Sequence, residues 1–189
     1  MTFMDKRQKE EFRMTKRRIE VNGQSISGKL QNAFDVSDAY TLSSIITGRL
    51  RKMDDDMWRG MAVSFMTGLI EILAWKRDNS NGEFKFDISV LESYINIKSA
   101  VMLSLDEDIP LSIRAQMITY LNGIPGMNDA VKKNLANEDE PDGCASIYRQ
   151  HGFITMQLTE SINKIKTGIL TLYVDKKGHM FKFERMSSI

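Results

Sequence analysis

The longest apolar stretch of the sequence, MWRGMAVSFMTGLIEILAW at residues 57–75, constrains the fold more than any other feature. Its 19 residues are long enough to cross a membrane as a helix, but they include Arg59 and Glu71. Each charge near the centre of a bilayer costs about 2.5–3.5 kcal/mol. Because the stretch is apolar on nearly all sides, we expect a helix that is buried at the centre of a helical domain.

The overall composition is that of an ordinary soluble globular protein. Of the 189 residues, 42% are hydrophobic and 27% are charged, which excludes an intrinsically disordered chain. The 26 basic and 25 acidic residues give a net charge of +1, so no overall charge marks a nucleic-acid or membrane binder. Cys144 is the single cysteine, so it cannot form an internal disulfide and suits a reducing compartment. The first 20 residues lack an apolar run, so we expect no signal peptide.

Helical signals dominate residues 33–167. Ser37 or Asp38, Asp87 and Asn96 are expected N-caps, and Pro110 suits a first helical turn. The first of these helices spaces its apolar residues at helical intervals: Tyr40, Leu42, Ile45, Ile46 and Leu50. A long last helix over residues 145–166 has this expected buried face: Tyr148, Phe153, Ile154, Leu158, Ile162 and Ile165. We therefore predict an all-α fold, a compact bundle of about six to seven helices.

The two ends of the chain have a different character. Residues 1–32 are expected to form a charged leader followed by a loop rich in Gly, Ser and Asn. Residues 5–20 hold seven basic and four acidic residues, typical of a solvated helix or a flexible leader. A basic arm that binds nucleic acid or anionic lipid is the alternative. Residues 168–189 form a C-terminal edge segment with a possible β-hairpin, although its first half could equally prolong the last helix.

The segment NGQSISGKL, residues 22–30, approaches a phosphate-binding loop. From Gly23 it has the Gly-x4-Gly-Lys spacing, but Leu30 stands where a hydroxyl must bind magnesium. Asp175, after GILTLYV, resembles the second acidic element, yet the sequence predicts no parallel sheet between the two. We therefore expect no nucleotide site, no cofactor and no catalytic residue, and interpret residues 23–29 as a flexible lead-in to the first helix.

Other patterns predict little chemistry. Cys144, His151 and His179 lack the short paired spacings of zinc sites, so no metal site is expected, and no hydrolase triad is indicated. His151 is expected at a turn or packed at a helix start. An acidic surface loop, NEDEPDG at residues 137–143, is the candidate partner-binding site for basic partners. Its charged residues are Glu138, Asp139, Glu140 and Asp142.

Four phrases follow one another in a characteristic order. They are MWRGMAVSFMTGLIEILAWKRD (57–78), FDISVLESYINIKSAVML (86–103), YLNGIPGM (120–127) and QHGFITMQLTESI (150–162). Together they resemble the all-alpha domain of type IV secretion coupling proteins, in the branch that serves Dot/Icm-type secretion and related conjugative plasmids. The resemblance covers roughly residues 33–167 and rests on packing and turn signals.

The resemblance implies a non-catalytic recognition domain, excised from a ring-forming VirD-type motor ATPase at the cytoplasmic face of the bacterial inner membrane. Its implied partners are secreted substrates, adaptor or chaperone proteins, a relaxase–DNA complex in conjugation, and the remainder of the ATPase. The resemblance further implies that this part of the protein does not itself insert into the membrane. A small helical nucleic-acid-binding protein that uses the basic leader is the alternative function.

Overall fold

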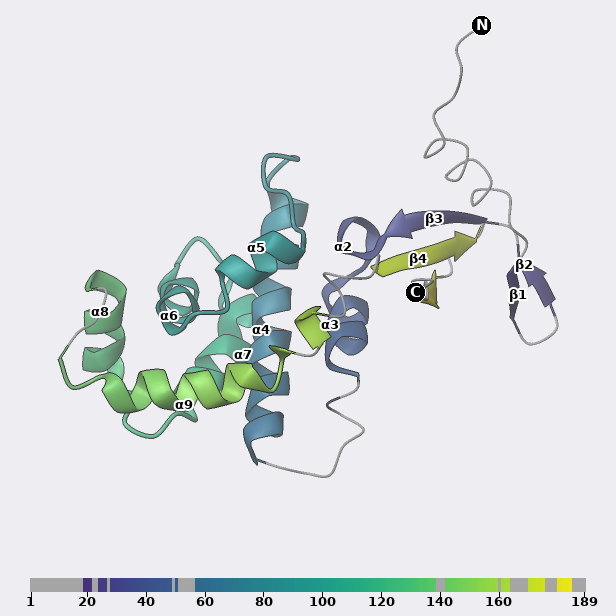
Figure 1. Cartoon of the computed structure of the whole chain (residues 1–189). Helices are drawn as coiled ribbons and strands as arrows, with labels where there is room; N and C mark the ends of the chain where they lie inside the picture. The colour runs from purple at the N-terminus through teal and green to yellow at the C-terminus, as the bar shows by residue number, and fades with distance from the viewer. Residues whose placement is uncertain are drawn as a thin grey trace, which may run out of the picture. The chain divides into compact units, whose positions relative to one another are not determined.

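The computed structural model describes residues 19–21, 24–26, 28–48, 50, 57–138, 142–159, 161–163, 170–175 and 180–184 (Figure 1). The chain divides into two compact units. One is Ser37–Lys166, and the other combines Met1–Val36 with Thr167–Ile189.

The unit Ser37–Lys166 is helical. Its named helices, within the described residues, are α3 (Ala39–Thr47), α4 (Met57–Asn79), α5 (Ile88–Ser93), α6 (Ile97–Leu105), α7 (Leu111–Asn122), α8 (Asp129–Asn137) and α9 (Ala145–Met156). These seven helices confirm the predicted all-α fold class.

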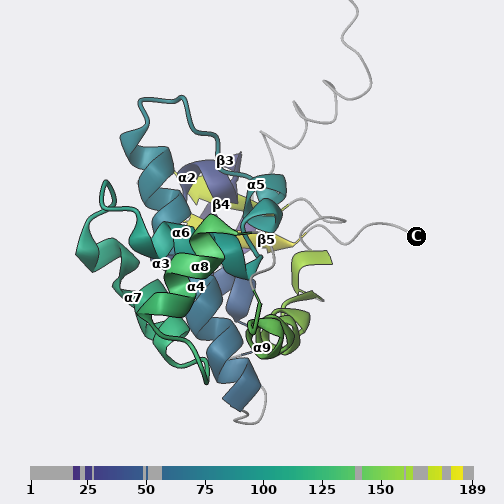
Figure 2. The ribbon, with the colours of Figure 1, turned by 90° about the vertical axis from the view of Figure 1, so that its left-hand side faces the viewer.

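Helix α4 lies at the centre of this unit, with α3, α5, α7 and α9 packed against it (Figures 1 and 2). Its buried residues are Ala62, Phe65, Met66, Gly68, Leu69, Ile70, Ile72, Leu73 and Ala74. In the described part of the chain, α4 is the one helix whose length and composition would allow it to span a membrane. The core helix of a soluble protein passes the same test, and the extensive burial of α4 fits the central helix that the sequence predicts.

Close contacts with two helices, α7 and α3, fix the position of α4. A Cβ atom built on Gly68 would lie 2.8 Å from the backbone nitrogen of Met117, so α4 and α7 approach each other closely at this glycine. Nearby, Gln116 Nε2 donates a hydrogen bond of 2.7 Å to Ser64 Oγ. On the other side, the hydroxyls of Ser43 in α3 and Thr67 in α4 are 2.9 Å apart. The apolar core is therefore aligned by polar pairs at both helix contacts.

The helix starts follow the predicted caps. Asp38 accepts a hydrogen bond from the backbone N–H of Thr41, Asp87 from that of Val90, and Asn96 from that of Ser99. Pro110 is the N-cap residue of α7. Helix α8, capped by Asn128, was not predicted, because its short sequence has few apolar residues.

The last predicted helix is shorter than expected, and its buried face is different. Helix α9 ends at Met156, where tight turns over residues 157–158 interrupt it before further helical residues at 159 and 161–163. The buried side chains are Ile147, His151, Ile154, Leu158 and Ile162. Phe153 is 48% exposed, so its placement on the buried face was wrong, whereas Tyr148 is partly buried. Tyr40, 81% exposed, corrects the prediction for α3 in the same way, and Ile165 lies outside the described residues.

The other unit contains the strands. β1 (Ile19–Val21) pairs with β2 (Gln24–Ile26), and β3 (Gly28–Asn32), β4 (Leu170–Asp175) and β5 (Met180–Glu184) form a sheet in that order. All pairings are antiparallel. A short helix, α2 (Ala33–Val36), follows β3. The pairing of β4 with β5 confirms the predicted C-terminal strands. The predicted loop was wrong at residues 24–26 and 28–32, which form strands; residues 1–18 lie outside the described residues.

Candidate functional site

The apparent phosphate-binding motif lies in extended backbone. Gly28 and Lys29 are part of β3, where they pair with Asp175 and Val174 of the antiparallel strand β4. A phosphate-binding loop instead needs a loop that leads directly into a helix, with the acidic element on a parallel strand of the same sheet. The flexible lead-in predicted over residues 23–29 is therefore replaced, in its described part, by β2 and β3; Gly23 itself lies outside the described residues.

The predicted acidic surface loop is only partly described. Glu138 and Asp142 are exposed, while Asp139 and Glu140 lie outside the described residues. The backbone N–H of Glu138 donates to Asn134 O and ends α8. The structure thus places the two described carboxylates at the surface, and their role in binding stays a prediction.

Of the three candidate soft or imidazole ligands, Cys144 and His151 are buried, and His179 lies outside the described residues. Among the described residues, no group of three or more His, Cys, Asp or Glu side chains is placed to hold a metal ion. His151 lies within α9 and not at a turn or helix start, which corrects the sequence interpretation.

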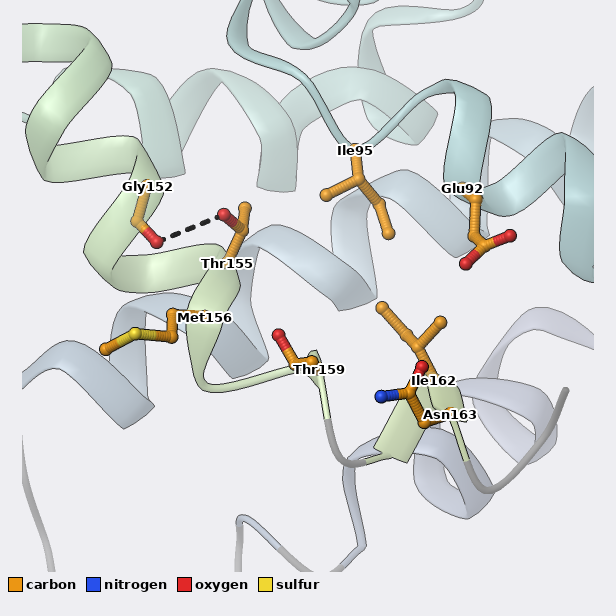
Figure 3. Close-up of a pocket in the computed structure, with 8 residues that line it drawn as sticks. All are labelled: Glu92, Ile95, Gly152, Thr155, Met156, Thr159, Ile162 and Asn163. Atoms are coloured by element: carbon orange, nitrogen blue, oxygen red, sulfur yellow. Dashed lines mark hydrogen bonds between the residues drawn. The ribbon is translucent and has the colours of Figure 1, made fainter. Parts of the chain in front are cut away.

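An open hollow lies beside α9, opposite the junction of α5 and α6 (Figure 3). Its volume is about 290 Å³. The lining residues are Glu92, Ile95, Gly152, Thr155, Met156, Thr159, Ile162 and Asn163. In Figure 3 the side chains of Glu92 and Ile95 point into the hollow from the α5 side, and that of Ile162 lies opposite them. The lining of the hollow therefore combines apolar side chains with a carboxylate, hydroxyl groups and an amide.

His151 connects the two sides of this hollow. Its Nε2 lies 2.6 Å from the backbone oxygen of Ile95, and its Nδ1 lies 2.6 Å from the hydroxyl of Tyr120. Since a carbonyl oxygen only accepts, Nε2–H is the donor to Ile95. In the neutral ring Nδ1 then accepts from the Tyr120 hydroxyl. His151 thereby holds α9 to both α7 and the α5–α6 junction.

The environment of this histidine favours its neutral form. His151 is 5% exposed, and its ring meets the Phe65 ring edge-on at a centroid distance of 5.0 Å. Burial lowers the pKa of His151, and the hydrogen bond to Ile95 raises it in part. Burial also raises the pKa of Tyr120. Both members of the pair are therefore neutral near pH 7, which fits a hydrogen bond from the Tyr120 hydroxyl to Nδ1 of His151.

Large apolar side chains are exposed on α9 and at the start of α4. Phe153 and Met156, one helical turn apart, are 48% and 60% exposed. Trp58 of α4 contacts Phe153 with ring centroids 6.0 Å apart, and its neighbour Met57 is 66% exposed. We call these four residues the α9 surface. Exposed apolar side chains that gather in this way are typical of protein interaction sites.

No family model and no solved structure matches the sequence. The type 4 coupling protein DotL of Legionella pneumophila subsp. pneumophila is 27% identical over 142 residues, covering 68% of this chain. This similarity relates the chain to type 4 coupling proteins. The match spans 16% of the length of DotL. It confirms the relation to coupling proteins that the four sequence phrases predict, but it does not identify a domain or its role.

The sequence interpretation missed both the His151 network and the α9 surface. A signal for the first was present, because Ile147, His151, Ile154 and Leu158 follow one another at intervals of three or four residues. The signal for the α9 surface was that Phe153 and Met156 are not part of this repeat of buried residues.

Proposed function

We propose that the chain is a recognition segment of a type 4 coupling protein, which docks secreted proteins or their adaptors before translocation. The α9 surface carries this proposal, and the similarity to DotL supports its setting. In this proposal the chain lies at the cytoplasmic face of the inner membrane and works together with the remainder of a coupling ATPase.

The exposed apolar area of the α9 surface can stabilise a complex, because a partner protein would remove it from water. Full burial of a Phe or Met side chain stabilises a complex by about 1.5–3 kcal/mol. The exposed parts of Phe153, Met156 and Met57 supply such area beside a contact that already orders Trp58. Aromatic residues and methionine are enriched at protein interfaces, and methionine adapts to partners of different shape.

Site-specific photocrosslinking in the bacterium that encodes the chain tests this function. We expect a photoreactive phenylalanine analogue in place of Phe153 to crosslink to secreted proteins or adaptors, identified by mass spectrometry. The same analogue at Asp142 tests the acidic loop, where basic partners are expected. Tyr40, an exposed aromatic residue on α3, is the matched control position. Crosslinks from position 153 that reach only other copies of the coupling protein would contradict the proposal.

We also propose that this segment contributes docking and not ATP hydrolysis. The antiparallel pairing of Gly28 and Lys29 with β4 supports this, since it lacks the loop-to-helix arrangement of a phosphate site. Calorimetric titration of the chain with Mg-ATP should show no binding, and Lys29→Ala should leave the trace unchanged. Magnesium-dependent micromolar binding that Lys29→Ala removes would show this proposal to be wrong.

A further inference from the structure

The sequence contains the dipeptide Asn-Gly three times, and the fold treats its copies differently. The copy at residues 81–82 lies in the turn between α4 and α5, at the top of Figure 1, and the copy at residues 122–123 lies at the end of α7. The copy at residues 22–23 lies outside the described residues. An asparagine before a glycine can lose its side-chain amide, because the glycine has no Cβ to shield its backbone nitrogen. The structure decides which of the two described copies is free to react.

The first described copy is a tight turn that is open to water. Asn81 has a φ of 52° and Gly82 a φ of 88°, and the backbone N–H of Glu83 donates to Ser80 O over 3.1 Å. These are the features of a type I′ turn, whose two central residues both have positive φ angles. In the part of the chain that the structure describes, Asn81 is the one residue other than glycine with a positive φ. Asn81 and Gly82 are both exposed, so water reaches the amide and the backbone nitrogen that follows it.

Neither reacting group of this turn is held by a hydrogen bond. The backbone N–H of Gly82 has no acceptor, and the Asn81 amide has no partner, among the described residues. The ends of the turn are fixed, by contrast. Ser80 Oγ donates to Arg77 O over 3.1 Å and accepts from the Phe84 N–H over 2.9 Å. The two central residues can therefore change conformation between fixed ends, which lets the amide carbon approach the Gly82 nitrogen.

The copy at the end of α7 has the opposite arrangement. The backbone N–H of Gly123 donates to Thr119 O over 3.1 Å and to Tyr120 O over 3.0 Å. The side-chain oxygen of Asn122 accepts a hydrogen bond of 2.7 Å from Lys132 Nζ, and Lys132 is 7% exposed. Attack on this amide requires the Gly123 N–H to lose its acceptors and Asn122 to leave Lys132. The fold therefore protects the second copy.

We propose that Asn81 is a site of spontaneous covalent modification, at which the folded chain converts a side-chain amide to a carboxylate. The Gly82 nitrogen attacks Cγ of Asn81; the N–Cγ bond forms, the Cγ–Nδ2 bond breaks, and ammonia leaves, its extra proton balancing the one lost from the Gly82 N–H. Water then opens the cyclic succinimide. Opening at Cγ gives aspartate with a normal backbone, and opening at the backbone carbonyl carbon gives isoaspartate, whose backbone runs through the side chain. This inference does not depend on the proposed function.

Either product changes the connection between α4 and α5. The new carboxylate lies just beyond Asn79, the last residue of α4, where the carbonyl end of the helix disfavours negative charge. Isoaspartate also lengthens the backbone, so the hydrogen bond from Glu83 N to Ser80 O loses its turn geometry. The modification therefore alters both the charge and the shape of this turn.

Incubation of the full 189-residue chain in mildly alkaline buffer at physiological temperature, followed by peptide mapping with mass spectrometry, tests the proposal. We expect Asn81 to lose its amide about tenfold faster than Asn122 or more, since Asn122 reacts only after its local hydrogen bonds break. Isoaspartyl methyltransferase should label the same Asn81 peptide. In guanidinium chloride, which unfolds the chain, the two copies should react at similar rates. Equal rates in the folded chain, or an amide retained at Asn81, would overturn the proposal.

A variant of the turn supplies the control. Asn81→Gly removes the amide and keeps a residue that adopts positive φ, so the resulting Gly-Gly pair retains the type I′ turn. During the same incubation it should form acidic species on native isoelectric focusing more slowly than the wild type. Asn81→Asp marks the position of the product with a normal backbone. If Asn81→Gly forms acidic species as fast as the wild type, the reaction takes place at another residue and the proposal is wrong.

Discussion

Replacing Gly68 by alanine should lower the free energy of unfolding of the helical unit by about 2 kcal/mol. The added Cβ would lie 2.8 Å from Met117 N and 3.2 Å from both Gln116 C and Met117 Cα. All three atoms belong to the backbone of α7, so no side chain can turn away to make room. The two helices must separate, and contacts among the fully buried side chains of α4 and α7 weaken.

Urea unfolding followed by circular dichroism measures this change. Gly60→Ala in the same helix is the control, because its added Cβ meets no atom within 4 Å. It should stabilise the protein by about 0.5 kcal/mol through helix propensity. If Gly68→Ala is as stable as Gly60→Ala, α4 and α7 do not pack as closely as the structure places them.

Local sequence signals predicted the helices because their causes are local. Asp38, Asp87 and Asn96 each cap the helix that follows through a side chain three residues before the bonded N–H. The burial of α4 was predictable from an apolar run with few charges. Spacing alone could not decide which aromatic residues are buried. Tyr40 and Phe153 fit a helical repeat, but both are exposed. Other residues of α3 and α9 form the faces that pack against α4.

Features that join distant parts of the sequence were not predictable in this way. Strand β3 pairs with residues about 140 positions later in the chain, and its composition, rich in Gly, Lys, Gln and Asn, is typical of loops. The hollow likewise depends on His151 reaching Ile95, 56 residues away. A single histidine in a helix carries no signal for its partner. The candidate binding surface could therefore be recognised only in the structure. The relation to coupling proteins was predicted from the order of four short sequence segments.

Replacing His151 by phenylalanine should lower the free energy of unfolding by about 3 kcal/mol at pH 7.5. The ring is kept, but the Tyr120 hydroxyl and the Ile95 carbonyl each lose a hydrogen-bond partner. Tyr120→Phe alone should cost about 1 kcal/mol. The double variant should cost less than the sum of the two, because without the hydroxyl there is no orphaned donor. Additive costs would mean that Tyr120 and His151 are not bonded to each other.

The loss of stability in His151→Phe should shrink at lower pH. Burial depresses the pKa of His151 in the folded protein below its ordinary value of 6.5. Between that value and the depressed pKa, the unfolded chain binds a proton that the folded chain does not, so the wild type loses stability as pH falls. The loss approaches about 1.4 kcal/mol per pH unit in this window. His151→Phe lacks this proton, so the difference in stability between the two proteins should narrow from pH 7.5 to 5.5. The carboxylates and His179 are present in both proteins, so their contributions cancel in the comparison. A difference that stays constant or widens would mean that the folded protein binds this proton at least as readily as the unfolded chain. In the protonated ring Nδ1–H would donate to the Tyr120 hydroxyl oxygen, and the neutral arrangement derived from the two 2.6 Å contacts would be wrong.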